Sequence, residues 1–449
     1  MTLEKTQTIP VTRRERFSWY LYDFANTSFT VLIITAMYPL FFKDLANMVF
    51  MDDGVTGGAL WGYATSITMV IVALSSPVLG AIADYSGSKK KFLTAYTALC
   101  IIFNALMFFL RDDIPKFLGV DMWVWGFILF VIANIGFQGG LPFYNAWLPE
   151  ISTEETIGRI GGNGYAAGYV GAMCTILIAL VSYVAIPQYP TLPFLFSAIF
   201  FLIFAIPSIM GLQNRPASKR PEEEGMSYIS IGFGRVRRTF REIKYYQGVG
   251  LFLVSYFLFA DAINTVISYA SIYGVEVFSF DTGSILIFFA VTQLAAIPGA
   301  FIFGYVADRI GTKKTLMITL LIWVVALVVA YIGTDPIVFW VIGMLAGVGM
   351  GSSQSTARSM YGQFIPEEKK SEMYGFYALT GKVAAILGPF VYGTVLLAAG
   401  GLGIVTAHRT AMLSILLFFV IAFIILLKVR QPVKGESKTE VWLDDDLAP

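Results

Sequence analysis

Long apolar runs without a single charge dominate this sequence. Residues 124–135, 192–209 and 411–427 contain no Asp, Glu, Lys or Arg. A helix needs about 20 apolar residues to cross a hydrocarbon core of about 30 Å. In such a core only helices and closed barrels satisfy every backbone polar group. No alternating barrel pattern is present, and 14% of the residues are charged, against about 25% in soluble domains. The sequence therefore predicts an all-α integral membrane protein.

Twelve transmembrane helices are predicted, arranged as two six-helix bundles. The first bundle covers 17–210 and the second 246–428, between a cytoplasmic N-terminus (1–16) and a cytoplasmic tail (429–449). The polar stretch 211–245 forms a cytoplasmic linker. In its second half apolar residues recur every three or four positions among Arg and Lys, which predicts a basic amphipathic helix on the membrane surface. The predicted spans are 17–42, 57–83, 92–110, 121–147, 160–184, 190–210, 246–273, 282–306, 314–333, 336–360, 372–398 and 408–428.

The distribution of positive charge predicts the orientation of these spans. Four cations fall in predicted outer segments and two in predicted spans, and the rest of the 31 Lys and Arg lie on the side of the termini. The outer four are Lys43, Arg111, Lys116 and Arg409. Both termini are therefore predicted to be cytoplasmic.

An internal repeat relates the two predicted bundles. The pattern G-x-x-x-D-x-x-G-x-K-K ends the second span and recurs at the end of the eighth. It comprises Gly80, Asp84, Gly87, Lys89 and Lys90 in the first half and Gly304, Asp308, Gly311, Lys313 and Lys314 in the second. The pairs Asp23-x-x-Asn26 and Asp261-x-x-Asn264 match, as do Pro149-Glu150 and Pro366-Glu367. Such parallel repeats place a substrate site near the midplane between halves.

The repeated element resembles the inner-loop signature of the major facilitator superfamily. That resemblance implies the major facilitator fold and a cluster that latches the cytoplasmic side, so the ten residues of the two elements are expected to be gate residues. Glycine permits close helix approach, and a carboxylate accepts hydrogen bonds at a neighbouring helix N-terminus.

Two further segments are similar to a narrower group. They are WYLYDFANTSF at 19–29, and GSSQSTARSMYGQFIPE with YGFYALTGKVAAILGP between 351 and 389. Together they resemble the vacuole-effluxer-like, autophagy-related family. The resemblance implies amino acids as solutes, because its fungal members are associated with amino-acid release from the vacuole. The superfamily's antiporter signature, a Gly-Pro in the fifth span, is missing, so antiport is not predicted.

Four charged residues fall inside predicted spans: Asp23, Asp261, Arg358 and Lys382. Each needs a partner or a water-filled cavity, since an intramembrane charge costs at least about 2.5–3.5 kcal/mol. Lys382 is predicted to bind a substrate carboxylate, with pairing to Asp23 or Asp261 as the alternative. Asp261 either accepts a proton, binds an ammonium group or is a structural carboxylate. Asp23 occupies the repeat position that matches Asp261, and an interfacial pair with a basic loop residue is the alternative to a functional role. Arg358 is assigned to gating or structure.

Neutral polar residues complete the candidate site. Asn26 and Asn264 accompany the two Asp residues, and Gln138 and Asn145 share one face of the fourth span because they are seven residues apart. This stripe either lines the cavity or joins helices by hydrogen bonds. The single histidine, His408, is expected to be an ordinary interfacial residue.

These features favour a secondary transporter of a small polar solute that works by alternating access, with protons as a candidate coupling ion. Peptides, sugars and organic acids are alternative solutes. A transporter-derived sensor or partner-binding protein is an alternative function that would require a long signalling extension. No protease or transferase motif is present, so no enzyme, cofactor or metal is expected. The net charge of +1 predicts no nucleic-acid partner. The expected partners are the solute, the bilayer and protons, and the expected state is a monomer in the plasma (inner) membrane.

Overall fold

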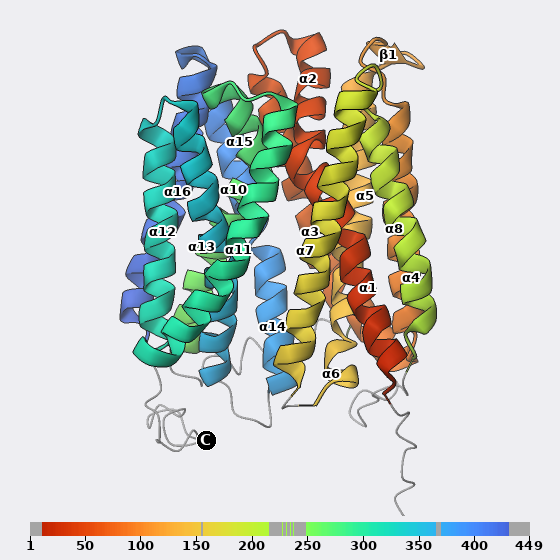
Figure 1. Cartoon of the computed structure of the whole chain (residues 1–449), viewed down its shortest axis with the longest axis vertical. Coiled ribbons are helices and arrows are strands. Elements are labelled where there is room, and N and C mark those ends of the chain that lie inside the picture. Colours follow the sequence, from red (N-terminus) through yellow and green to blue (C-terminus); the bar gives the residue numbers. More distant parts are fainter. Residues whose placement is uncertain are drawn as a thin grey trace, which may run out of the picture.

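The protein is a bundle of long, nearly parallel helices (Figure 1). The computed structural model describes residues 11–153, 156–214, 248–364 and 370–430, with 227, 230, 234 and 237. Within this part of the chain eleven helices are long and apolar enough to cross a membrane, and a bent pair at the start gives a twelfth when it is counted as one span. The predicted all-α membrane fold is confirmed. Most of the predicted linker, with its amphipathic helix, and most of both terminal segments lie outside the described residues.

The helices divide into two groups that pack mainly within themselves. In Figure 1 the first group, red to lime, lies beside the second, green to blue. The first contains α1 (Arg13–Phe29), the π-helical η1 (Thr30–Ala36), α2 (Tyr38–Phe50), α3 (Val55–Ser86), α4 (Lys89–Leu106), α5 (Met122–Asn145), α6 (Leu148–Ile151), α7 (Ile157–Ala185) and α8 (Leu192–Gly211). The second contains α10 (Val249–Phe278), α11 (Thr282–Ile310), α12 (Thr312–Ile332), α13 (Pro336–Gln363), α14 (Lys370–Val383), α15 (Leu387–Ala399) and α16 (Ile404–Lys428).

The start of α1 and the end of α16 lie at the same end of the bundle (Figure 1). We call this end the terminal side and the opposite end, which carries α2 and a small hairpin, the far side. The hairpin pairs β1 (Lys116–Phe117) with β2 (Val120–Asp121). Its two central residues, Leu118 and Gly119, both have positive φ, as a tight two-residue turn between twisted strands requires. The sequence pattern did not predict this hairpin.

The first span is longer than the predicted 17–42 and is bent. Its helix α1 continues as η1 and then turns by 43° into α2. Pro39 occupies the first turn of α2, where its missing N–H is tolerated, so the helix restarts there. As a result Lys43, which was predicted in an outer loop, lies in a helix and is buried.

The eleventh span is broken where a continuous helix was predicted over 372–398. Helix α14 ends at Val383 and α15 begins at Leu387. Between them, two hydrogen bonds of the 3₁₀ type replace the α-helical ones: Ala385 N–H donates to Lys382 O, and Ile386 N–H to Val383 O, both at 3.3 Å. The proline ring of Pro389 would clash with the carbonyl four residues earlier in a regular helix, which explains the break.

Candidate functional site

Lys382 joins the two groups of helices. It lies in the last turn of α14, and its Nζ donates a hydrogen bond of 2.5 Å to Oε1 of Gln138 on α5. Within the described part of the chain no carboxylate lies at ion-pair distance from this ammonium group, so neither predicted pairing, with Asp23 or with Asp261, is present. A cation in a span with only a neutral amide as partner is poorly compensated, so the site favours an anionic group from outside the protein.

Asp261 holds the start of α15 in place. The residue is fully buried on α10, and its Oδ2 accepts a hydrogen bond of 2.7 Å from the N–H of Gly388. The other oxygen, Oδ1, is buried and has no hydrogen-bond partner among the described residues. A Cβ at position 388 would lie 2.0 Å from Thr265 Oγ1 and 2.8 Å from Asp261 Oδ1, so only glycine lets the carboxylate approach this closely.

The first half repeats this arrangement of a carboxylate against a glycine. Asp23 on α1 lies against Gly164 of α7, where an added Cβ would be 2.8 Å from Asp23 Oδ2. Gly164 precedes Gly388 by the same interval that separates the two copies of the G-x-x-x-D-x-x-G-x-K-K element. Unlike the eleventh span, however, α7 is unbroken. Both halves therefore hold an Asp carboxylate against a glycine, but only the second half has a helix break beside this contact.

The two Asp-x-x-Asn pairs differ in structure. In the first half Asn26 is buried and its Nδ2 donates to Asp23 Oδ1 at 3.4 Å. In the second half Asn264 is exposed and makes no hydrogen bond to Asp261 among the described contacts. The sequence match therefore predicts the positions of the four residues but not their pairing.

Several polar side chains within spans are exposed. They are Asn145, Asn264, Gln354 and Arg358. Exposure to hydrocarbon would be costly for these groups, so their faces indicate a water-filled space between the halves. Arg358 interacts electrostatically with Tyr165 of the first half and with Tyr377 of the second. The predicted site residues therefore come from α1, α5, α10, α13 and α14, which belong to both halves.

The predicted gate residues lie on the terminal side. Lys89 forms an ion pair of 2.7 Å with Glu150, which follows the fourth span. Lys90 Nζ donates to the carbonyls of Met210 and Leu212 at the end of α8, at 3.3 and 3.0 Å. Each of these contacts stays within the first half.

The second copy of the gate element is shifted by one residue in space. Helix α4 begins at Lys89 but α12 begins at Thr312, so Lys313 occupies the place of Lys90. Its Nζ donates to the carbonyls of Leu427 and Val429 at the end of α16, at 2.8 and 2.7 Å. Lys314, the sequence match of Lys90, is exposed. These contacts, too, remain within one half.

The terminal side is open along the helices that carry this element. A Cβ added to Gly80 or Gly304 would meet nothing within 4 Å. Asp308 is exposed, and the side chain of Asp84 lies outside what the structure describes. Gly87 and Gly311, which end α3 and α11, have φ of 63° and 91° and so suit glycine.

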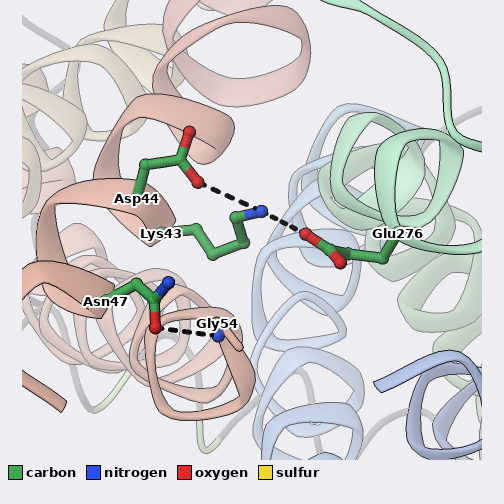
Figure 2. Close-up of polar contacts among 5 residues, drawn as sticks. All are labelled: Lys43, Asp44, Asn47, Gly54 and Glu276. Atoms are coloured by element: carbon green, nitrogen blue, oxygen red, sulfur yellow. Dashed lines mark hydrogen bonds and ion pairs between the residues drawn. The ribbon is translucent and has the colours of Figure 1, made fainter. Parts of the chain in front are cut away.

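The far side is closed by contacts between the halves. Lys43 of α2 forms an ion pair with Glu276 of α10 and lies 3.1 Å from the exposed Asp44 (Figure 2). Tyr269 Oη donates to the carbonyl of Gly58 at 2.9 Å, and Trp61 Nε1 to that of Ser268 at 3.0 Å. Close packing on this side and open space on the other indicate a conformation that is accessible from the terminal side.

Sequence reasoning missed the ion pair of Lys43 and Glu276. The apolar run of α10 continues beyond the predicted end of that span at 273, so Glu276 is a second carboxylate within this span, after Asp261, rather than a loop residue. That signal was available. Their pairing was not, because the two residues are 233 positions apart.

The expectation for His408 was wrong. Its side chain is fully buried near the start of α16, and Nδ1 is 2.9 Å from Tyr392 Oη. The residue was predicted to be interfacial from its position near the end of a span. Helix α3 of the other half covers that position, which hydropathy along one helix does not reveal.

The fold and the two-halved polar site define a secondary transporter of the major facilitator type. A solved structure of a mutant of the nucleoside transporter NupG covers 93% of this chain and 100% of its own, with a TM-score of 0.68 at 15% identity. A bacterial homologue of the human lysosomal transporter Spinster covers 94% and 98%, with a TM-score of 0.64 at 14% identity. At these identities the likeness establishes the fold.

The chain belongs to the vacuole effluxer Atg22-like family, whose sequence pattern matches residues 11–438. The uncharacterised MFS-type transporter YxiO of Bacillus subtilis (strain 168) is 30% identical over 441 residues, 95% of this chain and 96% of that protein. Autophagy-related protein 22 of Coccidioides immitis (strain RS) is 20% identical over 507 residues, 86% of this chain and 83% of that protein. The family assignment predicted from the sequence is confirmed, and the protein is a transporter and not an enzyme.

Proposed function

We propose that this protein carries amino acids across the plasma membrane by alternating access, with the terminal side facing the cytoplasm. The observation that carries the proposal is Lys382, a cation held between the halves by Gln138 with no carboxylate partner in the described structure. A substrate carboxylate supplies the missing anion. Because the contact spans both halves, a bound carboxylate would change the balance between conformations in which the halves approach on different sides.

Proton coupling is assigned to Asp261. A buried carboxylate with one unsatisfied oxygen is costly when ionised, and protonation removes that cost. The group also fixes the N-terminus of α15, the segment that follows Lys382 after the break. Protonation at Asp261 therefore acts on the same span that binds the solute. The orientation follows the excess of Lys and Arg on the terminal side.

The experiment that tests the solute class is counterflow in proteoliposomes. Vesicles containing the protein are preloaded with an unlabelled amino-acid mixture, and uptake of a labelled mixture is measured. Counterflow needs no gradient, so it assumes no coupling ion. Accumulation above that of protein-free vesicles supports the proposal. Its absence withdraws amino acids as the solute, and peptides, sugars and organic acids are then tested in the same assay.

Lys382→Ala should abolish counterflow, because the variant loses the cation that binds the substrate carboxylate. The protein should still fold, because the partner of Lys382 is the neutral amide of Gln138 and no buried charge loses its partner. The matched control is Lys116→Ala, which removes an exposed lysine from the far-side hairpin and should leave counterflow unchanged. Folding is checked by monodispersity in detergent. Unchanged counterflow in a folded Lys382→Ala protein would remove this residue from the site.

A further inference from the structure

The one histidine of the chain lies buried at the closed far side. His408 has no exposed surface, and Tyr392 Oη contacts its Nδ1 at 2.9 Å. The second ring nitrogen, Nε2, is also buried and has no hydrogen-bond partner among the described residues. An imidazole in this position has one nitrogen committed to a hydroxyl group and one that is unused.

The other half of the molecule covers this histidine. Gly58 of α3 packs over the ring, since a Cβ at position 58 would lie 3.8 Å from His408 Cε1. The ring of Tyr392 stacks on that of Tyr269 at 3.8 Å, and Tyr269 Oη donates to Gly58 O. The histidine is therefore linked through two tyrosines to a contact between the halves. When the halves separate on the far side, the cover over the imidazole is removed.

Burial without an ion-pair partner opposes an imidazolium in the closed state. Lys43 of α2 acts electrostatically on His408 and is itself paired with Glu276 of α10 and Asp44. The other titratable neighbours are the neutral phenols of Tyr273 on α10 and Tyr392 on α15. Helix α3 contributes Gly58. On α16 the next residue is Arg409, whose guanidinium donates to the carbonyl of Gly333. No described carboxylate bonds the ring, and burying an unpaired charge is costly.

We propose that His408 is a proton-binding site of the far-side gate, occupied when this side is open and empty when it is closed. The site is separate from Asp261, and only its assignment to the external face depends on the proposed orientation. Since the open state binds one more proton than the closed state, acidification shifts the population towards the open state and a rise in pH shifts it back. If the far side faces the exterior, an acidic exterior would thus favour the state in which the cavity is open to the exterior.

The conformational test uses spin labels and no solute, so it does not depend on the proposed substrate. Labels are placed at Met51→Cys and Leu402→Cys, exposed positions in opposite halves, after replacement of Cys100 and Cys174. We expect the distance distribution in nanodiscs to shift to longer values as the pH falls from 8 to 5. The shift should be lost in His408→Gln, whose amide cannot titrate, and should persist in Asp113→Asn, which changes an exposed carboxylate of the loop after the third span. An equal shift with and without the histidine would overturn the proposal.

A second measurement uses the unmodified ring and covers the case in which His408→Gln fails to fold. Diethyl pyrocarbonate modifies exposed neutral imidazole, and a chain with a single histidine and no histidine tag reports one site. We expect slow modification at pH 8 in the parent protein and faster modification in Lys43→Gln, which breaks the ion pair between the halves. Equally fast modification in both proteins would contradict burial by the closed gate.

Discussion

At the scale of single residues, three intramembrane charges account for the proposed chemistry. Lys382 contacts a neutral amide, Asp261 a backbone N–H, and Asp23 a side-chain amide. None of them forms an ion pair in the described structure. Ion pairing would cancel the charges within the protein, whereas neutral partners leave each charge available to a solute or a proton.

Asp261→Asn should separate transport from proton coupling. The asparagine oxygen still accepts the hydrogen bond from Gly388, so α15 keeps its anchor, but the side chain cannot titrate. We expect accumulation driven by an imposed pH gradient to be lost and counterflow, which needs no gradient, to be retained.

The control for this variant is Asp113→Asn, in the loop that follows the third span. Its hydrogen-bonded ion pair with Arg111 (2.6 Å) lowers the pKa of the Asp113 carboxyl, so this group stays ionised over the range of the assay. Gradient-driven accumulation should be unchanged in the control. Retained accumulation in Asp261→Asn would exclude that carboxylate as the coupling group.

At the scale of elements, two spans depart from a regular helix. The first carries the π-helical η1 and a bend, and the eleventh is interrupted between α14 and α15. Interrupted backbone at membrane depth needs polar partners. In the eleventh span these partners come from both halves: Asp261 accepts from Gly388, and Ser66 Oγ donates to Ile386 O at 2.8 Å. The break is thus part of the contact between halves.

Two glycines of α3 should respond differently to substitution by alanine. In Gly62→Ala the new Cβ would lie 2.3 Å from Pro389 O and 2.2 Å from Tyr269 Oη. We expect a lower melting temperature in detergent, from an overpacking cost of about 1–3 kcal/mol, and a shift towards the state that is open on the far side. Gly80→Ala, which meets nothing within 4 Å, should leave the melting temperature unchanged.

Gly80→Ala should nevertheless slow counterflow, because the terminal side must close around this position in the opposite conformation. Purified variants are compared by thermal denaturation and by initial rate of counterflow. Equal destabilisation by both alanines would contradict the assignment of a closed and an open side.

At the scale of the whole molecule, the two halves meet on the far side and separate on the terminal side. The ion pair between Lys43 and Glu276 is the charged contact of this closed side (Figure 2). Both side chains are largely buried, with 7% and 14% of their surface exposed. At this burial, removal of one partner leaves the other charge uncompensated.

Reversal of this ion pair tests its role in closure. Lys43→Glu gathers three carboxylates at the interface and Glu276→Lys brings two ammonium groups together, so each single variant should lengthen the distance between the labels at positions 51 and 402. The double variant should restore the parent distance. Reversal of the pair between the exposed Lys116 and the half-buried Asp121, which lies within one hairpin, is the control and should have no effect. Single variants that keep the parent distance would exclude a gating role for the pair.

The sequence alone determined the membrane class, the number and approximate limits of the spans, and the internal repeat. These properties depend on local hydropathy and on glycine and proline positions, which act over one helix or one turn. The sequence also identified Lys382, Asp261 and Asp23 as intramembrane charges, because each is a charged residue within an apolar run.

The tertiary structure alone decided what these charges contact and which side is closed. Lys382 and Gln138 are 244 residues apart, and Asp261 and Gly388 are 127 apart, so no local pattern specifies either contact. The same reason accounts for the burial of His408 under another half of the molecule and for the pairing of Lys43 with Glu276. The one-residue shift between the gate elements has a different origin, because it follows from where α4 and α12 begin. Hydropathy fixes where each helix lies in the membrane, but only packing between helices fixes which side chains face one another.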